Sequence, residues 1–102
     1  MNSLKSLNTN EISSLKLNDY VEVRVEYDYP IWCVSIFHLD VNGCSYTLNG
    51  ALADLKESIL GAYEIYVKER KEEELSGESI ELRNRLQSLV GEENYENAQR
   101  RN

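Results

Sequence analysis

The 102-residue chain is poor in the residues that build catalytic or metal sites, with one histidine, two cysteines and one proline. His38, Cys33 and Cys44 match no zinc-binding spacing, and no segment has the regularly spaced oxygen ligands of a calcium loop. The five glycines are isolated from one another, so there is no glycine-rich phosphate loop. These absences predict a protein that is not an enzyme and that holds no cofactor or metal.

Long hydrophobic runs are also missing. No apolar run approaches the roughly 20 residues that a membrane-spanning helix needs. Residues 1–10 have neither the basic flank nor the apolar stretch of a signal peptide. Hydrophobic residues make up 41% and charged residues 28%, which is typical of a single folded domain over residues 1–102. We therefore expect a cytoplasmic protein that does not bind a membrane.

Basic residues are in deficit. The chain has 11 Lys and Arg against 18 Asp and Glu, a net charge of −7. Residues 54–96 carry twelve of the acidic residues and six of the basic ones. Nucleic-acid binding is not expected, because Lys and Arg supply most of the affinity for phosphates. The charge favours a basic protein as the partner.

The dipeptide Asn42-Gly43 lies between two runs that alternate apolar and polar residues, a pattern typical of a two-residue hairpin turn. This turn places Val41 opposite Cys44. It puts one apolar set on the core face of the sheet: Phe37, Leu39, Tyr46 and Leu48. The opposite face then receives Trp32, Val34, Ile36 and His38.

The same register keeps the two cysteines apart. Cys44 lies opposite Val41, so Cys33 is eight residues farther along its strand, or roughly 26 Å away. A disulfide needs Cα atoms within about 7 Å, so we expect two free, buried thiols, as in a reducing compartment. Cys33 and His38 point to opposite faces of one strand, which excludes a thiol–imidazole pair.

Alternating apolar and polar residues predict a three-stranded antiparallel meander over residues 20–48. Two pairings are open across the connection at Tyr29-Pro30. An even pairing joins Val23 and Val25 to Val34 and Ile36. An odd pairing joins these valines to the face of Phe37 and Leu39, and it is preferred because it collects one continuous core.

Apolar residues at three- and four-residue spacing predict a long helix over residues 49–76, which covers the sheet, and a second helix over residues 78–91. Residues 92–102 are expected to form a polar tail with Tyr95 as its anchor. The expected fold class is therefore α+β, a three-stranded antiparallel sheet packed by two helices.

The N-terminal segment, residues 1–19, has two interpretations. A short helix that begins at Thr9 or Asn10 is one of them. The other is a backward extension of the first strand, because Leu15, Leu17 and Val21 keep its alternation.

This order of elements is similar in topology to the double-stranded RNA-binding domain, which stacks helices on one face of a three-stranded antiparallel sheet. That family has lysines at the start of its second helix. Residues 49–54 of this chain read Asn-Gly-Ala-Leu-Ala-Asp, so the resemblance does not imply phosphate binding, and we assign no family.

Three surfaces are candidates for partner binding. The first is the sheet face of Trp32, Val34, Ile36 and His38, where an aromatic anchor would lie inside a polar rim, unless another part of the chain covers it. The second is an acidic cluster at the helix junction, which could meet a basic protein or be a solvated helix end: Glu69, Glu72, Glu73, Glu74, Glu78 and Glu81. The third is an unpaired edge of the sheet.

We therefore hypothesise a small acidic protein-binding module that masks a basic surface of its partner, as an inhibitor, an antidote or immunity protein, or an assembly adaptor. The first alternative is a structural homodimer that associates through the Trp32, Val34 and Ile36 face or through a sheet edge. A weaker alternative is an enzyme of unknown class with His38 in its site.

Overall fold

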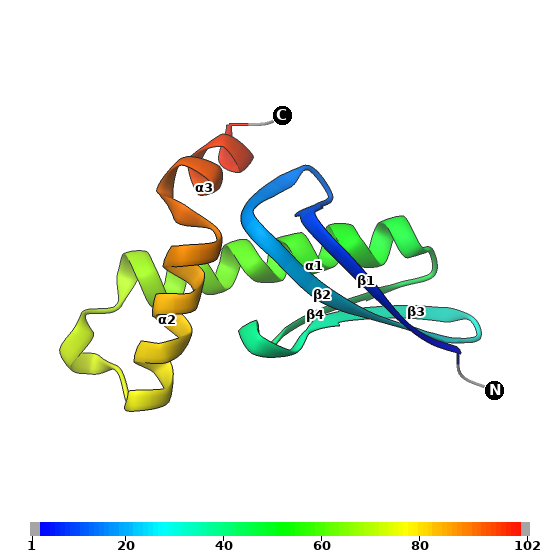
Figure 1. Ribbon diagram of the computed structural model, residues 1–102, viewed down its shortest axis with the longest axis horizontal. Helices are drawn as coiled ribbons and strands as arrows, with labels where there is room; N and C mark the ends of the chain where they lie inside the picture. Colours follow the sequence, from blue (N-terminus) through cyan, green and yellow to red (C-terminus); the bar gives the residue numbers. More distant parts are fainter. Residues whose placement is uncertain (1–2, 101–102) are drawn as a thin grey trace.

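The computed structural model describes residues 3–100 as an α+β fold, with an antiparallel sheet on one side and helices on the other (Figure 1). The sheet order is β1-β2-β3-β4. The strands are β1 (Ser3–Ile12), β2 (Leu15–Asp28), β3 (Ile31–Ile36) and β4 (Val41–Ser45). The α-helices are α1 (Leu48–Tyr63), α2 (Gly77–Leu89) and α3 (Gly91–Gln99). Three short helical segments complete the fold: η1 (Phe37–Leu39), η2 (Glu64–Glu69) and η3 (Glu72–Glu74).

The α+β class and the antiparallel sheet are confirmed, but the described sheet has four strands and not three. The helix considered at Thr9 or Asn10 is wrong, because this segment forms β1. The alternative interpretation is confirmed, since β2 begins at Leu15. Ser13 and Ser14 make the turn between β1 and β2, with φ of 49° and 77°. Left-handed backbone is uncommon for serine, so residue type alone does not mark this turn.

Asn42-Gly43 is not a turn, because both residues lie inside β4. The chain reverses at η1 and at Asp40, which has a φ of 53° and donates its N–H to the Phe37 carbonyl at 3.2 Å. Gly43 has a different role. A Cβ at this position would lie 2.3 Å from the backbone nitrogen of Leu55, because α1 passes directly over β4. The glycine therefore permits close approach of helix and sheet.

The displaced turn also changes the register of the cysteines. Cys33 lies opposite Cys44, with Cα atoms 4.1 Å apart, and the two residues form a disulfide. Both cysteines alternate along their strands with residues on the buried face, so the disulfide lies on the outer face of the sheet. The prediction of free thiols is therefore wrong. The argument from free thiols for a reducing compartment loses its support, since disulfides persist mainly in oxidising compartments.

The pairing of β2 with β3 is the even one, and the preferred odd pairing is wrong. Val25 lies opposite Val34, so the valines of β2 share a face with Val34 and Ile36. That face is the core: Val34 is 1% and Ile36 2% exposed. Phe37, predicted for the core, is 79% exposed because η1 turns it outward, and Tyr46 is 73% exposed.

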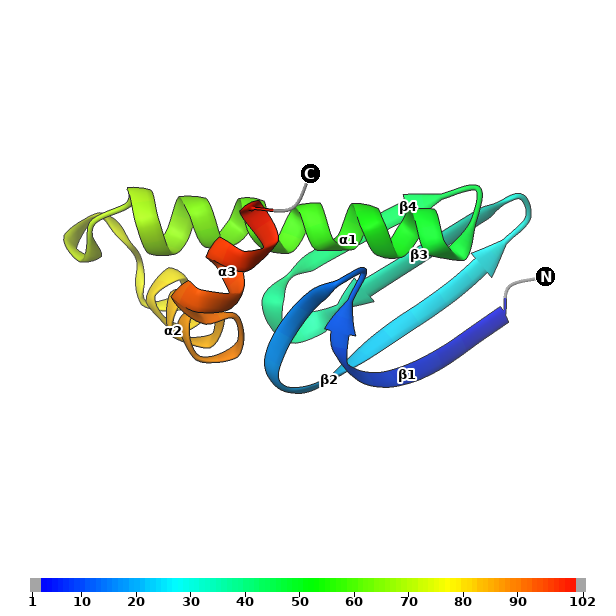
Figure 2. The ribbon, with the colours of Figure 1, turned by 90° about the horizontal axis from the view of Figure 1, so that it is seen from above.

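Helix α1 lies along the inner face of the sheet (Figure 2). Thr47 begins it as N-cap, and its hydroxyl oxygen accepts the Gly50 N–H at 2.9 Å. The predicted helix over residues 49–76 is too long, because α1 ends at Tyr63 and continues as the π-helical η2 only to Glu69. The buried side of α1 has the predicted spacing: Ala51, Leu55, Ile59, Leu60 and Tyr63.

Helix α3 replaces most of the predicted polar tail, and residues 101–102 of that tail lie outside the described residues. Tyr95 is the anchor, as predicted: it is buried, its ring stacks on Tyr63 at 4.7 Å, and its hydroxyl donates to the Glu64 carboxylate. That hydrogen bond raises the pKa of Tyr95. Burial, with Glu92 nearby, raises the pKa of Tyr63. The Tyr63–Tyr95 stack therefore holds the C-terminal helix against α1.

Asn18 makes a second attachment between the helices and the sheet. Four residues of β2, 17–20, lie opposite the single residue Asn10, and Asn18 lies in this bulge. Its side-chain amide donates to the Ser88 carbonyl at 3.0 Å, and its oxygen accepts a hydrogen bond from Asn94 at 3.0 Å. The bulge thus docks the α2–α3 junction on the sheet. Among residues 3–100, no helix is long and apolar enough to cross a membrane.

Candidate protein-binding surface

A large open cleft of about 660 Å³ lies between the end of the sheet and α2. Its apolar lining comes from β2, β3, η1 and α2: Val21, Ile36, Leu39 and Leu89. Its polar lining comes from the same elements and their neighbours: Asp19, Tyr20, Glu22, His38, Asn84, Arg85 and Ser88. An apolar floor within a polar rim is the usual make-up of a binding site.

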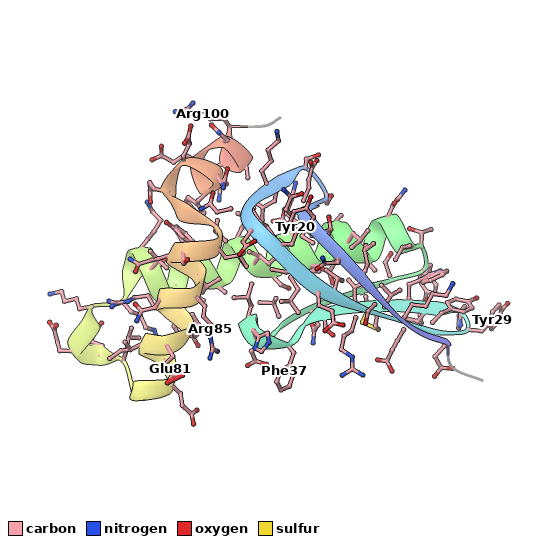
Figure 3. The ribbon with its side chains drawn as sticks, viewed as in Figure 1. Tyr20, Tyr29, Phe37, Glu81, Arg85 and Arg100 are labelled. Carbon is pink, nitrogen blue, oxygen red and sulfur yellow. A yellow bond between two sulfur atoms is a disulfide. The ribbon has the colours of Figure 1, made fainter. Side chains whose placement is uncertain are left out.

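The short helix η1 forms one wall of this cleft. Arg85 of α2 donates to the backbone carbonyl of His38 at 3.2 Å, which fixes η1 against the helix. Phe37 projects from the same turn into solvent, with its ring 5.8 Å from that of His38. Figure 3 shows Arg85 extending from α2 toward the turn that carries Phe37. Aromatic residues and arginine are each enriched at protein-binding interfaces.

A second hollow, of about 370 Å³, lies on the other side of His38 and Arg85. Its rim carries three carboxylates, from Asp40, Glu78 and Glu81. Arg85 is the cation that faces them, and its guanidinium lies 3.6 Å from Glu81. The two hollows and the turn between them form one surface, which we call the η1 surface. Negative charge prevails along its rim.

The structure separates the predicted sheet-face residues. His38 lies on the η1 surface, whereas Trp32 lies at the opposite end of β3, half-buried and 4.5 Å from the Tyr27 ring. Trp32 lines a small recess of about 130 Å³ there, with Lys5 and Val25. Val34 is buried under the helices. Ile36 is also buried, and it lines the floor of the large cleft. The predicted continuous face is wrong, because the even pairing turns it toward α1.

The predicted acidic cluster is only partly joined to the η1 surface. Glu69, Glu73 and Glu74 are exposed along the connection between η2 and α2. Glu78 and Glu81, both of α2, lie at the rim of the second hollow. The side chain of Glu72 lies outside the described residues.

Sequence reasoning missed Phe37, Arg85 and Tyr20 as surface residues. Tyr20 is exposed and borders the large cleft, because the β2 bulge turns it out of the sheet. Asp40 offered a signal for the turn, since Asp tolerates left-handed backbone, but Asn42-Gly43 has the stronger pattern.

Among the side chains that the structure describes, no three His, Cys, Asp or Glu residues are grouped closely enough to hold a metal ion. Comparison with known proteins gave no match to a family model, to a curated protein or to a solved structure. The functional argument therefore depends on the surface itself.

Proposed function

We propose that this chain is a protein-binding module that masks a basic segment of its partner on the η1 surface, and that it acts by binding rather than by catalysis. The observation that supports the proposal is the apolar floor of the large cleft beside a rim of carboxylates. The floor suits a large apolar side chain of the partner, and the carboxylates suit flanking Lys or Arg residues.

The rim supplies the charge that a basic segment would meet. Asp19 and Glu22 border the large cleft, and Asp40, Glu78 and Glu81 border the second hollow. With a net charge of −7, the whole chain adds long-range attraction, which raises the rate of association with a basic partner. Phe37 would supply contact area at the centre of the interface, between the two hollows.

The test is selection of random twelve-residue peptides on the purified protein, followed by calorimetric titration of the best binders. We expect these peptides to combine Lys or Arg with a large apolar residue. Phe37→Ala should weaken their binding by about thirtyfold, corresponding to a hot spot of about 2 kcal/mol. Tyr46→Ala is the matched control, because Tyr46 is an equally exposed aromatic residue outside both hollows.

A second pair of variants separates local charge from net charge. Glu22→Lys with Glu78→Lys reverses the rim, while Glu57→Lys with Glu93→Lys makes the same change of net charge at exposed positions elsewhere. We expect at least a tenfold loss of affinity for the first double variant and little change for the second. Selected peptides without excess basic residues, or equal losses in both double variants, would show that the proposal is wrong.

A further inference from the structure

The two edges of the sheet differ in what covers them. Along β4, the Cys44 N–H donates to the Asp54 carboxylate at 3.0 Å, and the Asn42 carbonyl accepts from Ser58 at 2.7 Å. Both partners belong to α1, so the helix occupies the hydrogen-bonding groups of this edge. Strand β1 pairs with β2 on one side, and no described element pairs with its other side.

The open part of β1 runs from Ser3 to Thr9. Beyond it, the Thr9 hydroxyl accepts the Glu11 N–H and donates to the Glu11 carbonyl, both at 3.1 Å. The backbone N–H and C=O of Glu11 therefore already have hydrogen-bond partners. Every second residue of the open part directs its N–H and C=O away from β2, because a strand pairs alternately to its two sides. An edge of this length is a template for another strand.

Leu7 is an exposed apolar residue in the open part. It is 43% exposed, although it lies opposite Val23 on the side of the sheet that carries the core. It is exposed because β1 extends beyond the cover of α1 (Figure 2). Lys5 is two residues away on the same side and is the only charged residue between Ser3 and Asn10.

We propose that β1 pairs antiparallel with β1 of a second copy of this chain, about a two-fold axis through Leu7. This register sets Leu7 against Leu7 of the second copy and covers both exposed side chains. It sets Lys5 opposite Thr9, so that the two lysines do not face each other. Such contact is isologous and closes as a dimer, with one continuous eight-stranded sheet.

A second copy fits this edge better than a foreign strand because the edge is complementary to itself. Antiparallel pairing about Leu7 matches apolar to apolar and polar to polar over residues 5–9, with Ser6 opposite Asn8. The large cleft and the second hollow include no residue of β1, although Ser6 lines a third hollow together with Phe37 and Glu22. The cross-links at Leu7 therefore test the dimer with substitutions outside the two hollows of the proposed function.

The test is cross-linking of the full chain through single introduced cysteines. Leu7→Cys should form a bridge between two copies on mild oxidation, since directly opposed Cα atoms lie about 4.5–5.5 Å apart, within disulfide range. Lys5→Cys should not bridge alone, but should do so with Thr9→Cys. Tyr46→Cys is the control, because it measures how often exposed thiols of two molecules form a disulfide by random collision. Peptide mapping identifies the cysteines in each bridge.

Light scattering of the unmodified chain and of Leu7→Lys completes the test. We expect a dimer for the first and a monomer for the second, because two lysines would then face each other at the axis. Circular dichroism should stay unchanged, since the side chain is exposed. A monomer at all concentrations, a dimer that survives Leu7→Lys, or bridging by Lys5→Cys alone would each overturn the proposal. If the chain is a monomer at all concentrations, the open edge of β1 would instead be available to a strand of a different protein.

Discussion

The two edges of the sheet, β4 and β1, differ in how their outward-facing backbone groups are covered. At β4, α1 approaches so closely that only glycine fits at position 43, and Asp54 and Ser58 bond the free backbone groups. At β1, no described element pairs with the outer side of the strand, and Leu7 remains exposed. A closed edge can only support the fold, whereas an open edge is available for association.

The difference is best tested at Gly43, where we expect the largest effect. Gly43→Ala should destabilise the fold by about 3 kcal/mol, because its Cβ would lie 2.3 Å from Leu55 N and 2.5 Å from Ala51 O, which belong to the helix backbone. Gly61→Ala is the matched control: it lies within α1 with nothing in 4 Å, and should stabilise by about 1 kcal/mol. Urea unfolding measures both. Equal effects of the two substitutions would contradict the close approach of α1 to β4.

The disulfide provides a second, smaller test at the closed edge. It joins β4 to β3 across 11 residues of sequence, so Cys33→Ser with Cys44→Ser should cost about 2–3 kcal/mol in unfolding free energy. The β4 edge should stay closed, because α1 still covers it. Thermal unfolding and light scattering would show a less stable protein of unchanged size. Growth in size at native temperature would mean that the disulfide, and not the helix, closes the edge.

The closed edge also explains what the sequence could and could not predict. Asn42-Gly43 has the pattern of a turn, but Gly43 is required by a helix that begins only at Leu48, and a local pattern carries no information on such a contact. The displaced turn shifted the β3–β4 pairing. Phe37 was assigned to the core for that reason, and the disulfide was excluded, because a change of register alters which side chains face each other.

Features that depend on local spacing were predictable. The buried side of α1 and the start of β2 at Leu15, one of two interpretations, follow from periodicity. Of the candidate surface, four residues were named from the sequence: Ile36, His38, Glu78 and Glu81. Arg85 was not, because its role depends on a hydrogen bond to a residue 47 positions away. The open edge of β1 required knowledge that the N-terminal segment is a strand.

The smallest effect on stability, and the sharpest test of edge closure, comes from the two side chains that cover β4. Asp54→Ala with Ser58→Ala should cost only about 1–2 kcal/mol, because both hydrogen bonds are exposed and water can replace them. The uncovered backbone groups should nevertheless allow β4 to pair with other copies. Light scattering should then show species that grow with concentration beyond the size of the unmodified protein.

Glu57→Ala serves as the control, since Glu57 is an exposed acidic residue of the same helix. It should leave both stability and size unchanged. If the double variant keeps the size of the unmodified protein, then the backbone of α1 over Gly43 is sufficient to close the edge. The hydrogen bonds of Asp54 and Ser58 would in that case stabilise β4 without protecting it, and the contrast between the two edges would depend on the position of the helix alone.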